Sequence, residues 1–321
     1  MCQYSVDAGD GRLNEWHYVH YVSRAVGGTG LILVEMTDVD PNGRITKGDS
    51  GIWDESHVAP LRRIADQVHR YGARFGVQIA HAGRKATDPH WDVVAPSAIR
   101  FSERLPMPRA LSTDECRALV DKFAAAARRV VEAGADVVEL HGAHGYLLNQ
   151  FMSPGSNHRS DVYGDPTRFA VEVIEAVRAE MPAGLPLFMR VSAVEYSPEG
   201  YTLEQLVEMV RVFRRAGVDL FDVSSGSNYP TGPERVFPGY QVPYAERIRQ
   251  AVGVPVMAVG MLEDPLLAES VLAEGRADLV AVGRGHLANP YWANAAALAL
   301  GEPVQTPWEY DRAFPGFKRP A

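Results

Sequence analysis

Cysteine is scarce in this chain of 321 residues, and its scarcity narrows the chemistry available to the protein. The two thiols, Cys2 and Cys116, are too few for a disulfide framework or for an iron-sulfur cluster, which is held by four thiolates. Cys116 falls within a helical pattern, so we expect it to pack in the core. A disulfide-stapled fold and an iron-sulfur enzyme are both excluded by this count.

Net positive charge and long apolar runs are also lacking. The formal net charge is −8 and the sequence pI is about 5.7, which disfavours a nucleic-acid surface because basic residues must neutralise the phosphates. No stretch is apolar and long enough to cross a bilayer, and the start, MCQYSVDAGDGR, lacks the apolar segment of a signal peptide. We expect a cytoplasmic enzyme for small molecules, without nucleic-acid or membrane partners.

No flexible linker divides the sequence. The alternation of elements is not interrupted by a Gly/Ser-rich or charge-blocked segment, and the stretch around Pro106 and Pro108 lies within one strand-to-helix connection. Hydrophobic residues make up 46% of the chain, which is enough for one large core. We therefore predict a single domain over residues 1–321.

Seven apolar runs have the character of buried parallel strands, and helix-period segments separate most of them. They are Leu31–Glu35, Phe75–His81, Val137–His141, Leu187–Ser192, Leu220–Ser224, Val256–Gly260 and Leu279–Gly283. A closed parallel barrel needs eight strands, and Met1 stands where the other strand is expected. An open dinucleotide-binding sheet is disfavoured because no G-x-G-x-x-G motif follows an early strand. We predict a (β/α)8 TIM barrel that lacks its first strand in this chain.

Between the strands, the sequence predicts amphipathic helices. Apolar stripes run through residues 58–68 and 119–131, and Ser112 and Glu115 precede the second stripe at capping-box spacing. Three similar segments, EAGADVVEL, RAGVDLFDV and EGRADLVAV, each carry a glycine where a helix ends. These are Gly134, Gly217 and Gly275, and a glycine there can adopt the left-handed conformation that closes a helix.

Polar residues gather where the predicted strands end, which is where barrels of this class carry their active sites. They are Gln78, His81, His141, His144, Arg190, Ser192, Ser224 and Ser225. The segments VGMLEDP and VGRGHLANP place Gly260, Gly283 and Arg284 where such barrels commonly bind phosphate. The alternative interpretation is that both glycines only form tight turns.

Arg190 needs an anion, because an unpaired guanidinium near a barrel interior is costly. The anion is either a carboxylate, for which Glu139 and Glu195 are candidates, or a negatively charged cofactor. The segment Ala82–Leu111 shows no periodicity, which favours a lid over the barrel mouth, with a structural insertion as the alternative.

His141 and His144 lie three residues apart after one strand, and Tyr146 follows them. Two imidazoles and a phenol on one short loop can hold a carbonyl or phenolate oxygen and supply a proton. A zinc site is the less favoured alternative, because His81 is the only evident third ligand. We therefore predict no metal at this site.

Four segments of the chain form an ordered set of motifs: HAGRKA (81–86), ELHGAHGYLLNQFMSP (139–154), NHRSDVYG (157–164) and RADLVAVGR (276–284). In this order they resemble the Old Yellow Enzyme family of FMN-dependent ene-reductases. MCQYS and FPGYQV resemble the thermophilic-type branch of the family. The resemblance implies a (β/α)8 barrel with FMN at its mouth, reduced by NADPH or NADH and reoxidised by an activated alkene.

The resemblance also implies roles in cofactor binding. Gln78 is similar to the contact with the flavin pyrimidine edge, and Arg190 to the arginine near flavin N1 and O2. Gly283 and Arg284 match the phosphate site. Cys2 is similar to a cysteine beside the flavin, although an ordinary amino-terminal thiol is the alternative, and Met36 falls where a small residue usually faces the flavin.

For the substrate, His141 and His144 resemble the pair that binds the electron-withdrawing oxygen, so that hydride reaches the β carbon. Tyr146 resembles the proton donor to the α carbon, and Tyr4 a tyrosine over the substrate. Arg312, in WEYDR, resembles an arginine that reaches into a neighbouring subunit, which implies a homo-oligomer; a solvated arginine is the alternative.

Two departures from the family pattern affect the expectation. Family members normally carry about 20 to 25 residues before MCQYS, which form the first of the barrel's strands. Either the true start lies upstream, which we favour, or the chain is a truncated barrel with an open edge and impaired catalysis. The turn at VYGDPTRF is also shorter than usual.

Rival functions are a related flavin reductase of another substrate class and a cofactor-free isomerase of phosphate sugars. A dienoyl thioester reductase needs an iron-sulfur cluster, which two cysteines cannot build. An isomerase would leave the paired imidazoles, Gln78 and Arg190 unexplained.

Overall fold

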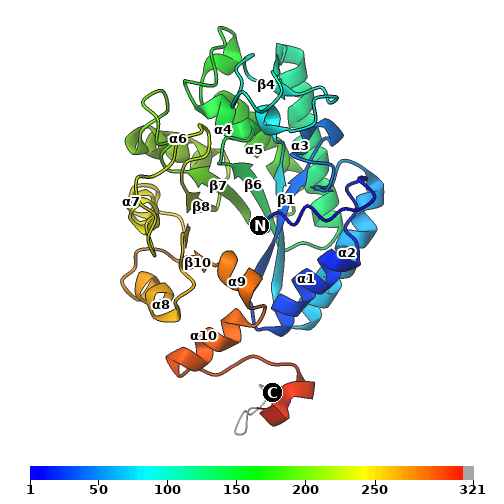
Figure 1. The fold of residues 1–321 in the computed structure, drawn as a ribbon, viewed down its shortest axis with the longest axis vertical. Coiled ribbons are helices and arrows are strands. Elements are labelled where there is room, and N and C mark those ends of the chain that lie inside the picture. The colour runs from blue at the N-terminus through cyan, green and yellow to red at the C-terminus, as the bar shows by residue number, and fades with distance from the viewer. Residues whose placement is uncertain (314–321) are drawn as a thin grey trace.

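The protein is described by a computed structural model that covers residues 1–313, without the side chains of Asp311 and Arg312. A curled, all-parallel sheet forms its centre, and helices cover the outside (Figure 1). The sheet order is β10-β9-β8-β7-β6-β3-β1-β2, and a second, small sheet pairs β4 with β5. The strands are β1 (Leu31–Asp38), β2 (Ser50–Gly51), β3 (Arg74–Ala80), β4 (Val94–Ala95), β5 (Arg109–Ala110), β6 (Val137–Gly142), β7 (Leu187–Ser192), β8 (Leu220–Ser224), β9 (Val256–Val259) and β10 (Leu279–Ala281).

All seven strands predicted from the apolar runs are present, with ends that differ by at most three residues from the prediction. The largest difference is in β1, which continues to Asp38 instead of ending at Glu35. Its register shifts after Val34, and its last two residues pair with β2. Among the described residues, no strand pairing joins β10 to β1. The sheet is therefore the (β/α)8 arrangement with seven of its barrel strands, as predicted.

The helices alternate with these strands. They are α1 (Glu15–Val26), α2 (Val58–Arg70), α3 (Thr113–Glu132), α4 (Leu147–Met152), α5 (Arg168–Glu180), α6 (Leu203–Ala216), α7 (Val242–Val252), α8 (Pro265–Ala273), α9 (Arg284–Ala288) and α10 (Trp292–Leu300). Each long helix buries one apolar stripe against the sheet, as its helical period predicts. In α2 the buried stripe is the predicted one: Val58, Leu61, Ile64, Ala65 and Val68.

The predicted helix ends are also confirmed. The Ser112 hydroxyl accepts a hydrogen bond from the Glu115 amide at 3.2 Å, and the Glu115 carboxylate accepts one from the Ser112 amide at 2.7 Å. This reciprocal pair starts α3 because it satisfies two backbone donors that a helix start leaves free. Gly217 follows α6 with φ of 129°, a conformation that favours glycine.

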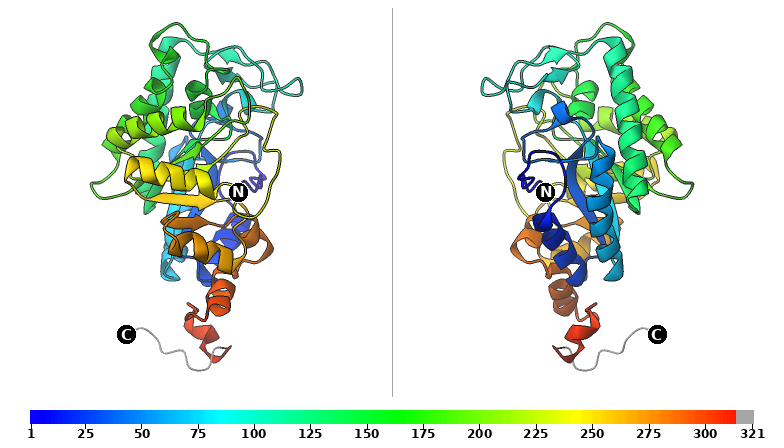
Figure 2. Two further views of the ribbon diagram at one scale, coloured as in Figure 1. Left: turned by 90° about the vertical axis from the view of Figure 1, so that its left-hand side faces the viewer. Right: turned by 90° about the vertical axis from the view of Figure 1, so that its right-hand side faces the viewer.

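Different elements lie at the two ends of the molecule. The segment that contains β4 and β5 lies at one end, and α10 lies at the opposite end (Figure 2). Strands β6, β7 and β8 end toward the former (Figure 1). Within the described part of the chain, none of the helices combines the length and apolarity that a membrane span requires.

Candidate functional site

The barrel interior is built in layers, because alternate residues of each strand point to the same face. The lowest layer is an apolar cluster of Val137, Phe188, Leu220 and Met257. Two residues further along their strands come Glu139, Arg190 and Asp222, and two residues beyond these come His141, Ser192 and Ser224. The polarity of the interior therefore rises toward the carboxyl ends of the strands.

The middle layer is polar and buried. Gln78 donates a hydrogen bond from Nε2 to Oε1 of Glu139 at 2.7 Å, and Arg190 Nε lies 3.4 Å from Oδ2 of Asp222. The sequence offered Glu139 and Glu195 as partners for Arg190, but the ion pair is with Asp222. Asp222 escaped prediction because it sits inside the apolar run LFDVS.

His141 is a neutral hydrogen-bond donor at the upper layer. Burial, together with the charges of His144, Arg190 and Lys85, lowers its pKa well below the ordinary value. Its Nδ1 accepts a hydrogen bond from the backbone amide of Ala143 at 3.4 Å. A neutral imidazole that accepts at Nδ1 carries its proton on Nε2, so His141 can donate that proton to an oxygen.

His144 is held by hydroxyls on β7 and β8, the two strands that follow β6 in the chain. Its backbone amide donates to Ser192 Oγ at 2.9 Å, and its Nε2 lies 2.7 Å from Ser224 Oγ. Its φ of 58° is unusual for a residue other than glycine and is fixed by these contacts. The structure therefore brings the predicted histidines together, with ring centres 5.1 Å apart, but engages Nε2 of His144 with Ser224.

Tyr146 lies next to this pair, with its ring centre 4.8 Å from that of His141. Burial raises the pKa of its phenol well above the ordinary value, so the hydroxyl keeps its proton at neutral pH. The ring packs against an apolar cluster at the mouth that contains Met36 and Ala80, with Cys2 and Trp91 also packed on it. Cys2, Met36 and Tyr146 thus share one wall.

Cys2 and Tyr4 lie on the amino-terminal segment that crosses this wall. Burial raises the pKa of the Cys2 thiol to about 12, so it is protonated at neutral pH. Tyr4 is half exposed with φ of 52°. Burial and the neighbouring Cys2 raise its pKa as well.

The predicted phosphate site combines glycine backbone with a free cation. Gly260 has φ of 126°, and a Cβ there would lie 2.9 Å from the amide of Gln241. Arg284 is exposed, and it forms no ion pair with any side chain that the structure describes. Burial raises the pKa of Tyr240, and the charges of Arg284 and Arg190 oppose this shift, so both guanidiniums act on one phenol. A Cβ at Gly283 would lie 3.0 Å from Sδ of Met1.

The start of the 82–111 segment lies across the strand ends. Lys85 Nζ donates to the carbonyls of His144 at 2.9 Å and Ser227 at 3.1 Å. Arg84 is buried and donates to the carbonyl of Asn228 at 2.6 Å. Gly83 has φ of 57°, and a Cβ there would lie 2.5 Å from the Gln150 amide, so only glycine fits. The loop is therefore anchored by these basic residues, whose role sequence reasoning did not assign.

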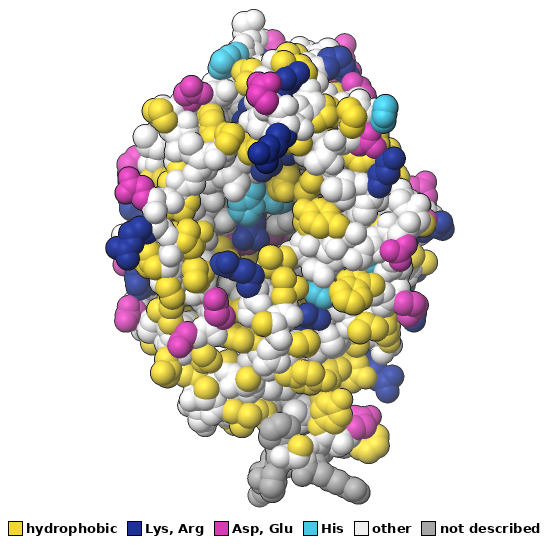
Figure 3. All heavy atoms as spheres, in the orientation of Figure 1, with side chains coloured by type: hydrophobic (Ala, Val, Ile, Leu, Met, Phe, Trp, Pro, Cys, Tyr) yellow, Lys and Arg dark blue, Asp and Glu magenta, His cyan; other side chains and the backbone are white. Residues whose placement is uncertain are grey.

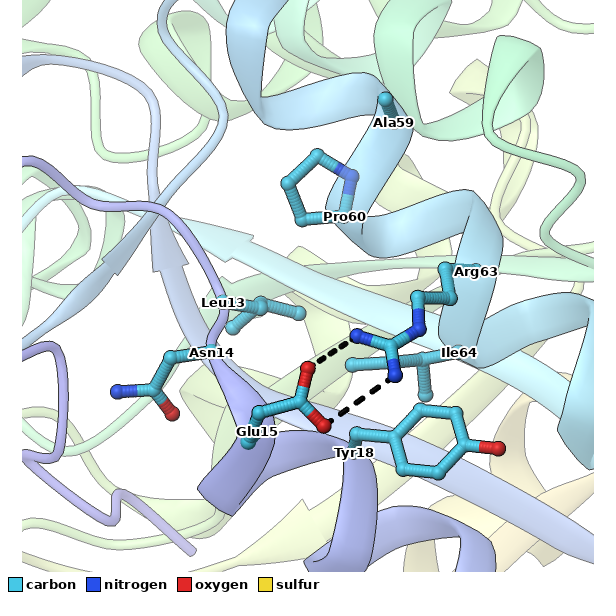
Figure 4. Close-up of a pocket in the computed structure, with 8 residues that line it drawn as sticks. All are labelled: Leu13, Asn14, Glu15, Tyr18, Ala59, Pro60, Arg63 and Ile64. Carbon is cyan, nitrogen blue, oxygen red and sulfur yellow. Dashed lines mark hydrogen bonds and ion pairs between the residues drawn. The ribbon is translucent and has the colours of Figure 1, made fainter.

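A hollow occupies the middle of the face that Figure 3 shows, with histidine and basic side chains in its walls. A separate pocket lies between α1 and α2, lined by residues that include Leu13, Tyr18 and Ile64 (Figure 4). Its charged groups, Glu15 and Arg63, form an ion pair with each other. Because those charges are already satisfied and no strand end reaches it, this pocket is not the functional site.

The remaining predicted residues are placed as follows. His81 is buried and its Nδ1 accepts from the Gly83 amide at 3.0 Å. In the described part of the chain, no group of three or more His, Cys, Asp or Glu side chains is arranged to hold a metal ion. The side chain of Arg312 lies outside the described residues.

The mouth suits an anionic, polar cofactor. Nε of Arg190 is buried without a hydrogen-bond partner, and one carboxyl oxygen of each of Glu139 and Asp222 is also unpartnered. Buried polar atoms of this kind normally have partners, so their orphaned state indicates a polar group above them. Arg190 and Arg284 supply the positive charge, and Gln78 supplies the amide, that FMN would need.

Comparison with known proteins identifies the family. Residues 1–301 match the model of the NADH:flavin oxidoreductase / NADH oxidase family. The chain is 48% identical to an NADPH dehydrogenase of Geobacillus thermodenitrificans, over 98% of this chain and 92% of that protein. It is 45% identical to an NADPH dehydrogenase of Listeria innocua, over 98% of this chain and 93% of that protein.

Solved structures agree with this assignment. Morphinone reductase in complex with tetrahydroNAD superposes with a TM-score of 0.79 at 26% identity, over 96% of this chain and 86% of that one. A 2-naphthoyl-CoA reductase gives a TM-score of 0.86 at 25% identity, over 95% of this chain and 50% of that one. The chain therefore belongs to the NADH:flavin oxidoreductase / NADH oxidase family, the Old Yellow Enzyme family, and is an FMN- and NAD(P)H-dependent oxidoreductase.

Proposed function

We propose that this enzyme reduces the activated C=C bond of α,β-unsaturated carbonyl or nitro compounds. The observation that carries the proposal is the pairing of a neutral donor, His141, with a protonated phenol, Tyr146, whose ring centres are 4.8 Å apart. When bound, FMN accepts hydride from NADPH or NADH and passes it to a substrate carbon. The chain itself must then polarise the alkene and supply a proton.

The residues that would hold FMN come from three parts of the site. Arg190 and Gln78 lie in the polar layer below, and Arg284 with the Gly260 and Gly283 backbone lies at the phosphate side. Cys2 and Met36 would border the ring from the apolar wall. The guanidinium of Arg190 is only partly exposed and favours negative charge in its neighbourhood, so Arg190 would stabilise the reduced, anionic cofactor.

His141 would bind the electron-withdrawing oxygen through its Nε2 proton. Withdrawing electron density through this hydrogen bond makes the β carbon more electrophilic, and the bond strengthens as negative charge develops on the oxygen. His144 would support the same oxygen through its position beside Ser224. Tyr146 keeps its proton at neutral pH and would donate it to the α carbon. Tyr4 would cover the substrate from the exposed side.

Other expectations stay predictions at this point. They are the single domain, the cytoplasmic location, the homo-oligomer and the contribution of Arg312 to a neighbouring subunit. Each follows from the sequence or from the family resemblance, and the geometry described above does not depend on any of them.

A product analysis in D₂O tests the proposal. FMN-loaded protein with NADPH and 2-cyclohexenone should form cyclohexanone with deuterium on the α carbon and protium on the β carbon. Tyr146→Phe should slow the reoxidation of the reduced enzyme by about 100-fold or more, the range of a lost general acid. Tyr71→Phe, at the end of α2, is the matched control and should leave the rate unchanged. Absence of cyclohexanone would exclude the proposed substrate class.

A further inference from the structure

The polar layer below the mouth contains carboxyl groups that have no role in the proposed reaction. Gln78, Glu139, Arg190 and Asp222 come from β3, β6, β7 and β8, four successive strands of the sheet. Gln78 is the Cα partner of Glu139, and Arg190 is the Cα partner of Asp222, so strand register sets each pair side by side. Only Arg190 and Gln78 have a role in the proposed function.

The charges in this layer do not balance. Glu139 and Asp222 are each 1% exposed, and the layer holds one guanidinium for the two carboxyls. Arg190 Nε lies 3.4 Å from Asp222, whereas the hydrogen bond that Glu139 accepts comes from the neutral amide of Gln78. A second buried negative charge without its own cation is costly, and a proton on one carboxyl removes that cost.

The hydrogen bonds show where this proton fits. Oε1 of Glu139 accepts from Gln78 at 2.7 Å, and Oε2 is buried without a partner in the described structure. A proton on Oε2 therefore leaves the bond to Gln78 intact. Gln78 keeps its orientation whether Glu139 is ionised or neutral.

We propose that Glu139 is a positioning residue that fixes Gln78 and takes up one proton from solvent when the cofactor site gains negative charge. The inference rests on the proposed function only in placing FMN beside Gln78 and Arg190. In the reductive step NAD(P)H loses a hydride and the site gains it, which adds one negative charge. Glu139 then forms one O–H bond with a solvent proton, and no other bond breaks.

The surroundings of Glu139 allow both protonation states near pH 8. Burial and the charge of Asp222 raise its pKa to about 8, while Arg190, the Gln78 hydrogen bond and the amino-terminal ammonium of Met1 oppose the shift. The titratable group above it on its own strand, His141, is neutral. Added negative charge at the mouth raises the pKa further, so reduction favours the protonated form.

The reduction potential of the FMN-loaded protein, measured from pH 6.5 to 9.5, tests this inference. Adding hydride alone takes up one proton for two electrons, which corresponds to about 30 mV per pH unit. Above about pH 8, the reduction potential of the wild type should fall more steeply with pH than this. Its slope should approach the value for two protons taken up with two electrons. Glu139→Gln keeps an acceptor for Gln78 but cannot ionise, so it should follow the one-proton slope. Glu208→Gln, on the surface of α6, is the control and should match the wild type.

Equal slopes in the wild type and Glu139→Gln would overturn the inference. If Glu139→Gln does not fold, an infrared difference spectrum of the wild type with ¹³C-labelled glutamate tests the inference instead. Reduction above pH 8 should add a labelled band of a protonated carboxyl, and a spectrum without that band also overturns the inference. If the slope is steep but no alkene reoxidises the enzyme, only the proposed substrate class fails. If purified protein takes up no FMN, both proposals fail.

Discussion

Lys85 places its ammonium 5.1 Å from the centre of the Tyr146 ring while it donates to the His144 carbonyl at 2.9 Å. It also lies 4.5 Å from the centre of the Phe101 ring. One cation from the 82–111 segment thus contacts the loop that carries both a proposed oxygen-binding histidine and the proposed proton donor. A positive charge at this distance favours the phenolate and makes Tyr146 a stronger acid.

Replacing this charge should slow proton donation. Lys85→Met keeps the length and apolar stem but removes the ammonium, so we expect the reoxidation of reduced enzyme by 2-cyclohexenone to slow by about 5- to 30-fold, the effect of roughly 1–2 kcal/mol. Stopped-flow absorbance of the flavin measures this rate. Lys47→Met, whose exposed ammonium pairs with Asp88, is the matched control. A rate equal to that of the wild type would show that Lys85 only anchors the loop.

The same charge predicts a pH dependence. Burial, with the charge of Arg84 adding to it, lowers the pKa of Lys85 to about 8. Lys85 is therefore charged below pH 8 and neutral above it, so the reoxidation rate should fall as the pH rises through 8. Lys85→Met should lose this step in the profile. A wild-type profile that stays flat through pH 8 would contradict the prediction.

His141 should dominate the binding of phenols, which place an oxygen where the substrate oxygen is proposed to lie. His141→Ala removes a hydrogen bond to a charged or partly charged oxygen, worth about 1.5–3 kcal/mol, and should weaken binding by roughly 10- to 100-fold. Titration of the oxidised FMN-loaded protein with a substituted phenol, followed by flavin absorbance, measures the Kd. His69→Ala, at an exposed end of α2, should leave the Kd unchanged. Unchanged affinity in His141→Ala would remove His141 from its proposed role.

The 82–111 segment is also held by an arginine between two indoles. The Arg44 guanidinium lies 4.7 Å from the centre of the Trp91 ring and 5.2 Å from that of Trp53. Trp91→Ala should lower the free energy of local opening of this segment by about 1–2 kcal/mol. The rate of amide exchange in residues 82–111 should therefore rise by roughly 5- to 30-fold. Hydrogen exchange with mass spectrometry resolves this region. Trp16→Ala, an exposed indole on α1, should not change it, and equal exchange in both variants would contradict the prediction.

The fold was readable from the sequence where local pattern decides it. Strands buried on both faces are continuous apolar runs, and for this reason Leu187–Ser192 was predicted with both ends correct. The end of β1 was not, because Thr37 and Asp38 continue the strand after a register shift, where they pair with β3 on one side and with the two-residue strand β2 on the other.

The candidate site, like the fold, has features that the sequence pattern predicts and features that it does not. Strand-end residues such as His141 and Tyr146 were identifiable from their spacing and from the family resemblance, and the structure brings them together. Asp222 was missed, because it sits inside an apolar run and its contact with Arg190 depends on the register of two strands. The engagement of His144 by Ser224 and the reach of Lys85 over Tyr146 are also contacts between segments far apart in the sequence. Sequence pattern identifies residue types at a site, whereas register and loop path decide their partners.

The central claim is that these strand-end groups converge around FMN and pass hydride to an activated alkene. Its most direct test is one anaerobic titration: FMN-loaded protein is bleached with one equivalent of NADPH, and 2-cyclohexenone is then added while the flavin absorbance is recorded. We expect the flavin absorbance to return fully with one equivalent of enone. A reduced flavin that stays bleached with excess enone, and recovers only when oxygen is admitted, would contradict it.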